Sequence, residues 1–376
     1  MIENPEVMSV APDEVVVTFS TAEGVEVRTE VGEAAVTTTG PHHVARVAGL
    51  ESATEYPVTV EGLDLPEDMP YLPATVTTLP APPGAWLCTV TTANDVHFGE
   101  VECGKLEGWG EDMIGPVFTT EPGETPYPEV MNRAAIAEMA SVDPAAVVVK
   151  GDLTSFGTEA EYEAFLAAYG TLGDRMHHVR GNHDAMHTDA IADTGPFAVT
   201  VPGAVLAVLD TVRPRHHTGR VTAEQVEWLD ALCAEADRPV LAFGHHNIWN
   251  LHADHRNPEY FGINPDDSEA LTGLAARREA FAGYFAGHTH RNRVRRFPEA
   301  RDVPFVEVAC VKDYPGAWAE YRIHEGGYVQ VHRRVGGLLG DRAALDWTEK
   351  TRQMFHGLYR DYALGPLDWR CFTHTF

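Results

Sequence analysis

The sequence predicts an α/β protein with a separate all-β domain at its N-terminus. Residues 7–80 show short runs of alternating β-branched residues and no helical pattern, whereas apolar strands alternate with amphipathic helices from residue 86 onward. The chain has 376 residues, which exceeds the usual size of one domain, about 100–150 residues. We therefore expect two domains. The intervening PAPPG, residues 80–84, reads as a stiff linker because proline fixes φ and blocks ladder pairing.

The N-terminal region contains five runs that predict strands. Each run combines β-branched alternation with flanking turn residues, and several short strands at this spacing are typical of a β-sandwich. The five expected strands are 14–21, 25–31, 43–50, 56–62 and 74–79.

The larger region predicts sheets that are covered by helices. Strands are expected at 86–92, 146–150, 204–210 and 239–244, and helices at 132–142, 158–170 and 222–236, the last capped by Thr222. Residues 247–268 read as a long loop, and residues 303–334 alternate as further strands. The tail, residues 336–376, is expected to pack on the core or on a partner subunit.

Composition excludes several functional classes. The formal net charge of −28 argues against a protein that grips a nucleic-acid polymer or an anionic membrane surface. No run of 18 apolar residues exists, and the first residues lack the pattern of a signal peptide. Five cysteines without a C-x-x-C pair indicate neither a disulfide framework nor a thiolate zinc site. The expected location is therefore cytoplasmic.

Polar residues that bind metals follow five predicted strands. Because ligand sites of α/β folds lie at the carboxyl ends of strands, we expect these side chains to converge. They offer nitrogen and oxygen donors but no sulfur, and they are too many for one ion, so they predict two ions that share a carboxylate. The segments are TTANDVH (Asp95, His97), KGDLT (Asp152), RGNHD (Asn182, His183, Asp184), GHH (His245, His246) and AGHTH (His288, His290).

These motifs, in this order over residues 85–330, resemble the calcineurin-like metallophosphoesterase superfamily. The resemblance implies a four-layer αββα fold with two central mixed sheets, and two ions of manganese, iron or zinc, with manganese and iron favoured. It implies that His183 protonates the leaving oxygen, that Asp184 orients His183, and that a metal-bridging hydroxide attacks in line. The implied metal ligands are Asp95, His97 and His290 for the first ion, Asn182, His245 and His288 for the second, and Asp152 as the bridge.

Two further resemblances concern the branch and the N-terminal domain. GDLTSFGTEAEY and GHTHRNR resemble the class III cyclic-nucleotide phosphodiesterase group. Leu50, Thr54 and Tyr56 resemble the fibronectin type III signature, in which a tyrosine at a strand corner bonds to the backbone. Purple acid phosphatases also carry an N-terminal sandwich, but their tyrosine ligand corresponds to Ser155 here.

Substrate contacts remain open at the sequence level. The pair His245 and His246 is ambiguous, and the resemblance favours His245, because the first histidine of the pair is the ligand in that family. Arginines after the last motif either attract an anionic substrate or lie in solvent, and alternation on a strand favours solvent. The candidate substrate contacts are Asn247, His246, His252, Tyr260 and Arg291.

The leading hypothesis is a dinuclear phosphodiesterase that acts on a cyclic nucleotide or another small phosphodiester. Its alternatives are a phosphomonoesterase similar to purple acid phosphatases and a phospholipid or nucleotide-pyrophosphate phosphodiesterase. A non-catalytic binding module is disfavoured, since every metal position is filled. The expected domains are a sandwich at 1–80 that docks on the catalytic domain and shapes one pocket wall, and a catalytic domain at 85–335. A homodimer is possible.

Overall fold

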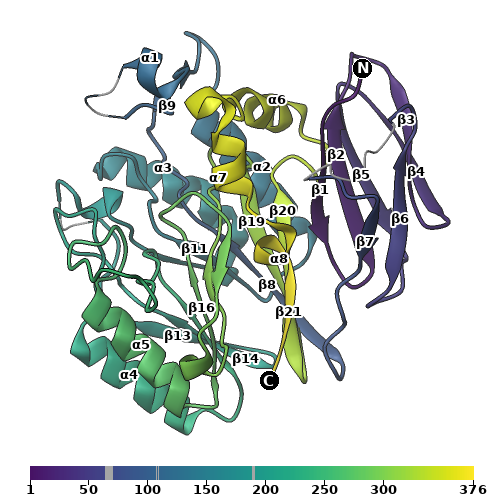
Figure 1. The fold of residues 1–376 in the computed structure, drawn as a ribbon. Helices are drawn as coiled ribbons and strands as arrows, with labels where there is room; N and C mark the ends of the chain where they lie inside the picture. The colour runs from purple at the N-terminus through teal and green to yellow at the C-terminus, as the bar shows by residue number, and fades with distance from the viewer. Residues whose placement is uncertain (64–70, 107, 109, 189–190) are drawn as a thin grey trace.

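The chain forms a small β-sandwich that packs against a larger α/β region (Figure 1). This computed structural model describes residues 1–63, 71–106, 108, 110–188 and 191–376. Within these residues, no helix has both the length and the apolar character needed to cross a bilayer. All five cysteines are free thiols.

The sandwich has a three-stranded sheet, β1-β2-β5, and a four-stranded sheet, β4-β3-β6-β7. Within the described residues, its strands are β1 (Glu3–Val10), β2 (Glu14–Ser20), β3 (Glu26–Val31), β4 (Ala34–Thr39), β5 (His42–Ala48), β6 (Glu55–Val60) and β7 (Thr75–Thr77). The predicted tyrosine corner is confirmed, because the Tyr56 hydroxyl accepts a hydrogen bond from the Glu51 backbone N–H at 2.9 Å. Strands β1 and β4 were not predicted: β1 has an irregular register, and β4 is a half-exposed edge strand.

The α/β region is built on two six-stranded mixed sheets. The first has the order β12-β11-β8-β19-β20-β21, and the second has the order β13-β14-β15-β16-β18-β17. The first comprises β8 (Trp86–Ala93), β11 (Ala146–Lys150), β12 (Met176–Val179), β19 (Ala317–His324), β20 (Gly327–Arg334) and β21 (Phe372–Thr375). The second comprises β13 (Phe197–Val201), β14 (Ala204–Val208), β15 (Val240–Phe243), β16 (Phe281–Ala286), β17 (Arg293–Arg295) and β18 (Phe305–Glu307).

Helices cover the outer faces of both sheets. The first sheet is covered by α2 (Tyr127–Ser141), α3 (Glu159–Tyr169) and α6 (Arg342–Thr351), and the second by α4 (Ala223–Glu235) and α5 (Pro265–Arg277). Strand β11 shows the layering, because Val147 and Val149 pack toward the helices while Val148 packs toward the other sheet. This arrangement confirms the four-layer αββα prediction.

One segment differs from the sequence-based expectation, and the tail takes one of the two arrangements expected for it. The loop predicted over 247–268 ends at Asn264, whose side chain accepts a hydrogen bond from the Asp267 backbone N–H and caps α5, with Pro265 in its first turn. The C-terminal tail packs on the core of its own chain. There β21 extends the first sheet, and α7 (Tyr359–Leu364) and α8 (Leu367–Arg370) follow the 3-10 helix η4 (Met354–Gly357).

A cluster of buried charges joins the sandwich to the tail. We call Glu6, Tyr314, Arg352 and Arg360 the interface cluster. The fully buried Glu6 carboxylate accepts hydrogen bonds from Arg352 at 2.5 Å, from Arg360 at 2.6 Å and from the Tyr314 hydroxyl at 3.1 Å. Each buried charge therefore has an opposite charge beside it, which offsets the cost of desolvation.

Candidate metal centre

The candidate ligands lie at the carboxyl ends of five parallel strands, where the two sheets meet. Strands β8, β11 and β12 lead to the first three motifs, and β15 and β16 lead to the last two. The structure thus brings the predicted metal residues of all five motifs together at one edge.

The backbone at this edge is unusual. Five candidate ligands have left-handed φ angles, a region that non-glycine residues seldom occupy and that costs on the order of 1 kcal/mol each. They are Asp95 (51°), His97 (46°), Asp152 (49°), His288 (68°) and His290 (54°). Strained backbone of this kind clusters at functional sites, where surrounding contacts hold it in place.

Glycines before the motifs allow the loops to approach closely. A Cβ on Gly181 would lie 2.2 Å from the Asp152 backbone nitrogen, and one on Gly287 would lie 2.7 Å from Asp95 Oδ2. Any larger residue at either position would push a carboxylate out of the site. The recurrent Gly-Asp, Gly-Asn and Gly-His spacing therefore has a steric cause.

Asp152 lies between two groups of donors. Its Oδ2 is 3.5 Å from His97 Nε2, and its Oδ1 is 3.3 Å from His245 Nε2. Burial by itself raises the pKa of Asp152, but the imidazoles of His245 and His183 outweigh it and hold this pKa well below the usual range. The two oxygens of one ionised carboxylate thus face two separate donor groups.

The first donor group combines Asp95, His97 and His290. Their ligand atoms lie within 4.8 Å of one another, and His290 Nε2 is 3.4 Å from Asp95 Oδ1. The Asp95 carboxylate also accepts from the His288 backbone N–H at 3.0 Å, which ties the first motif to the last.

The second donor group combines Asn182, His245 and His288. His245 Nδ1 donates to the Lys150 carbonyl oxygen at 2.8 Å, so its Nε2 is the ring nitrogen left for a metal ion, and this atom lies 3.1 Å from Asn182 Oδ1. A hydrogen bond of this kind from the remote ring nitrogen is how proteins orient a metal-binding imidazole.

The donor chemistry fits two metal ions. Both ring nitrogens of His97 and the Nε2 of His288 are buried without a hydrogen-bond partner among the described residues. Burial lowers the pKa of both imidazoles well below the usual value, so the rings are neutral with lone pairs available. An unsatisfied buried nitrogen is costly, and a cation would satisfy it.

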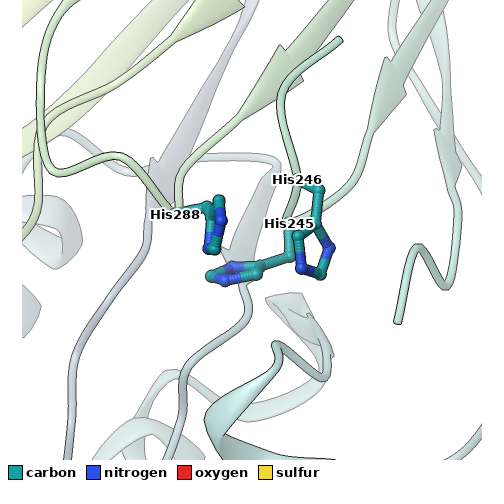
Figure 2. A group of neighbouring side chains, drawn as sticks. All are labelled: His245, His246 and His288. Carbon is teal, nitrogen blue, oxygen red and sulfur yellow. The ribbon is translucent and has the colours of Figure 1, made fainter. Parts of the chain in front are cut away.

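His245 and His246 have different surroundings, although both are fully buried and gather with His288 around one point (Figure 2). The Thr211 hydroxyl oxygen accepts from the backbone N–H of both residues, at 3.2 and 3.1 Å, which occupies its two lone pairs. Its proton therefore goes to His246 Nδ1, 2.9 Å away, and leaves the His246 proton on Nε2. Nε2 is thus the nitrogen that His245 can offer to a metal ion, whereas His246 carries its proton on Nε2.

The setting of His183 differs from the one predicted for it. His183 Nδ1 donates to the Ser155 carbonyl oxygen at 2.8 Å, so this carbonyl orients the ring. Asp184 instead accepts from the backbone N–H groups of Gly181 at 2.7 Å and Thr154 at 2.8 Å. Asp184 holds two motif loops together, because its carboxylate lies beside their backbone donors. Among the described residues, its hydrogen bonds go to these loops and not to the His183 ring.

The other candidate substrate contacts lie outside the pocket lining among the described residues. Asn247 donates to the Tyr260 hydroxyl at 2.6 Å, and the largely exposed His252 pairs with Glu299 at 2.8 Å. Arg291 donates to the buried Glu307 at 2.9 Å and lies over the Tyr362 ring, so it is not free for an anion. The side chains of Arg291 and His252 thus have protein partners outside the pocket lining, and their substrate roles stay predictions.

Sequence reasoning missed Asp313 and its neighbours. Asp313 Oδ2 lies 3.8 Å from His290 Nδ1, on the side of the ring that faces away from Asp95. Lys312 pairs with Glu100 at 2.6 Å, and Glu100 lies 3.5 Å from His97 Nδ1. The signal was present in the sequence, because Asp313 follows an apolar run, as the other motif residues do.

The donors open into one pocket of about 1160 Å³. Its floor includes His97, Asp152, Asn182, His183 and His288. Its outer walls come from described residues within 100–106, from Gly108 and Gly110, and from the C-terminal tail. No described residue of the sandwich lines it, so the role of the sandwich as a pocket wall stays a prediction.

Fold and site together define a four-layer α/β protein with donors for two metal ions between its sheets. The family model for calcineurin-like phosphoesterases matches residues 89–292, more than half of the chain. The chain therefore belongs to the calcineurin-like phosphoesterase family, as the motifs predicted.

Relatives with curated names match part of the chain. A glycerophosphodiester phosphodiesterase from Enterobacter lignolyticus is 26% identical over 170 residues, which cover 42% of this chain and 60% of the relative. A protein named "Probable cyclic nucleotide phosphodiesterase" from Rhodopseudomonas palustris is 30% identical over 173 residues, 42% of this chain and 62% of its own length. The match thus spans less than two thirds of these relatives.

One solved structure illustrates the shared fold. A dimetal phosphatase from Danio rerio superposes with a TM-score of 0.50 at 16% identity, over 67% of this chain and 98% of that one. At this identity the likeness concerns the fold alone.

Proposed function

We propose that this chain is a dinuclear metal-dependent phosphodiesterase that hydrolyses small phosphodiesters. The observation that carries the proposal is Asp152, whose two carboxylate oxygens face His97 and His245 at 3.5 and 3.3 Å. Two cations that share a carboxylate can stabilise both the attacking and the leaving oxygen of an in-line displacement at phosphorus. The names of the relatives, both phosphodiesterases, add support.

The proposed ligand sets follow the two donor groups. All donors are nitrogen or oxygen, which favours manganese or iron, with zinc as the alternative. When bound, such a pair polarises the phosphoryl oxygens and lowers the pKa of water into the neutral range. We assign Asp95, His97 and His290 to one ion, Asn182, His245 and His288 to the other, and Asp152 to both.

His183 is the proposed acid. Its Nδ1 proton is committed to the Ser155 carbonyl oxygen, so its Nε2 is the atom that protonates the departing oxygen. Its backbone N–H donates to Asp152 Oδ1 at 2.9 Å, which fixes the imidazole beside the shared carboxylate. In this proposal Asp184 is a positioning residue, because its hydrogen bonds hold the loops that carry His183 and Asp152.

Substrate preference tests the proposal directly. The manganese-loaded protein should cleave bis(4-nitrophenyl) phosphate with a higher kcat/KM than 4-nitrophenyl phosphate. Chelation should abolish turnover, and manganese should restore it. The opposite preference would select a phosphomonoesterase, and absence of turnover with two bound ions would refute a hydrolase of either kind.

A further inference from the structure

The mouth of the metal pocket carries exposed apolar side chains from four separate segments. Large hydrophobic residues seldom gather on a surface without a binding role. Fourteen large hydrophobic residues are exposed in the described parts of the chain, and six of them line this one pocket. We call the six the apolar rim: Val101, Leu106, Phe156, Phe261, Leu358 and Tyr362.

The rim is held in place by the metal loops and by the tail. The Phe261 ring stacks on the imidazole of His288, with ring centres 4.1 Å apart, and the Tyr362 hydroxyl donates to the Thr289 carbonyl oxygen at 2.8 Å. Yet Leu358 is 70% exposed and Phe261 is 53% exposed. Phe261 and Tyr362 are thus anchored to the metal loops, while the apolar surface of the rim faces water.

The two outer walls of the pocket, one after β9 (Glu102–Cys103) and one in the C-terminal tail, are in close backbone contact at Gly115. A Cβ on Gly115 would lie 2.7 Å from the backbone nitrogen of His356 and 3.2 Å from that of Phe355, so the segment after β9 touches the turn before α7. Phe355 and His356 hold left-handed φ angles of 52° and 55° at this turn. The pocket mouth is therefore held by tertiary contacts between two segments that are far apart in the sequence.

The charges of the pocket leave no cation for a second anionic group. Among the described lining residues, the lysines are Lys105 and Lys312, and the lining contains no arginine. Lys105 pairs with Glu102 at 2.6 Å, and Lys312 pairs with Glu100 at 2.6 Å. Apart from the ions, the pocket offers apolar surface and paired charges, which disfavours a substrate with several phosphates.

We propose that the pocket takes a phosphodiester that has one phosphate and one apolar chain, with the phosphate at the metal donors and the chain along the apolar rim. This inference rests on the proposed phosphodiesterase function and names its substrate class. The occupant is a single amphipathic molecule. This molecule enters from solution, and its apolar chain covers the apolar rim, so that both lose contact with water.

Chain-length dependence provides the test. Alkyl 4-nitrophenyl phosphodiesters from methyl to hexyl, all below their critical micelle concentrations, are compared as substrates of the manganese-loaded protein. Full burial of a methylene gives about fourfold in affinity, and burial of half its surface about twofold. We expect kcat/KM to rise about twofold per methylene. The gain should lie mainly in KM, since the rim is remote from the reacting atoms.

Binding of non-hydrolysable probes gives a second readout. Hexylphosphonate should bind about thirtyfold more tightly than methylphosphonate in calorimetric titrations, which is twofold for each of the five added methylenes. The double variant Val101→Ser, Leu358→Ser should flatten both dependences. Leu339→Ser, at an exposed leucine outside the pocket lining, is the matched control and should leave both unchanged.

The outcomes separate this inference from the proposed function. Turnover of all esters without chain-length dependence, and equal binding of the two phosphonates, would overturn the apolar-chain assignment and leave the phosphodiesterase intact. Loss of all turnover with two ions bound would refute the phosphodiesterase, and the phosphonate ratio would still decide the role of the rim. If the rim instead joins two copies, the protein would sediment as a dimer, the double variant as a monomer, and hexylphosphonate would have no advantage.

Discussion

The metal centre and the interface cluster are both buried and charged, but they are satisfied in opposite ways. At the interface cluster, Glu6 lies against two arginines and a tyrosine hydroxyl, and each group has its partner within the chain. At the metal centre, burial keeps the imidazoles of His97 and His288 neutral, and their buried nitrogens lack partners among the described residues. One cluster is complete as folded, and the other is arranged for cations from solution.

This difference means that the interface cluster contributes to the stability of the fold, whereas the metal centre contributes to ion binding. A self-satisfied ionic cluster loses stability when one partner is removed, because the remaining charge stays buried alone. A cluster that awaits a cation loses the cation instead, while the fold around it persists. The following changes test the distinction, from the largest expected effect to the smallest.

Asp152→Ala should have the largest effect. The variant should bind fewer than one ion per chain, because both donor groups lose their shared carboxylate, and kcat/KM for bis(4-nitrophenyl) phosphate should fall at least about 10³-fold. Elemental analysis and steady-state kinetics measure the two quantities. Asp237→Ala, at an exposed carboxylate paired with Arg238, is the control. Retention of two ions would remove the basis for a shared ligand.

His183→Ala should have an intermediate and selective effect. Both ions should stay, since His183 is outside the proposed ligand sets, but esters with poor alkoxide leaving groups should slow about 10²–10³-fold. Esters of 4-nitrophenol should slow much less, because 4-nitrophenolate leaves without a proton. His187→Ala, at an exposed histidine four residues away, should change neither rate. Equal losses on both kinds of ester would contradict the acid role.

Glu6→Gln should leave the activity unchanged and lower the stability. Burial raises the pKa of Glu6, but Arg352 and Arg360 outweigh it, so the pKa in the folded protein lies below its usual value. The carboxylate therefore stabilises the fold above pH ~4.3, and this contribution is lost as the pH falls through the folded pKa. Denaturant titration at pH 7 should show that the variant loses about 3 kcal/mol in the free energy of unfolding. The difference between the variant and the parent protein should become smaller at acidic pH.

The control for Glu6 is Glu3→Gln, at an exposed carboxylate of the same strand. It should leave the free energy of unfolding within about 0.5 kcal/mol of the parent protein. A fall in activity of Glu6→Gln without a fall in stability would mean that the two clusters are coupled.

Sequence reasoning reached the metal centre because its residues sit in short local patterns. A glycine followed by Asp, Asn or His after an apolar strand indicates by itself a polar residue at a strand end. Strand ends converge in this class of fold, so these residues meet. The layered core was also accessible, since residues 146–149 form a continuous apolar run, as expected for a strand buried on both faces.

The remainder depended on contacts between distant segments. Ser155 orients His183 through its backbone carbonyl, which no side-chain pattern reveals. The interface cluster joins Glu6 to Arg352 across 346 positions. The apolar rim is assembled from loops and from the tail, and an apolar residue in a loop is indistinguishable in sequence from one that packs inside.

The left-handed backbone at the five ligand positions has a consequence for engineering. Glycine at any of these positions would relieve backbone strain, because glycine adopts such φ angles freely. An aspartate or histidine holds them at a cost on the order of 1 kcal/mol. A screen that rewards heat tolerance in metal-free medium would therefore favour glycine at Asp95, Asp152 or His288 and discard catalysis unnoticed. Thermostable variants of this protein should be selected with metal present and activity as the readout.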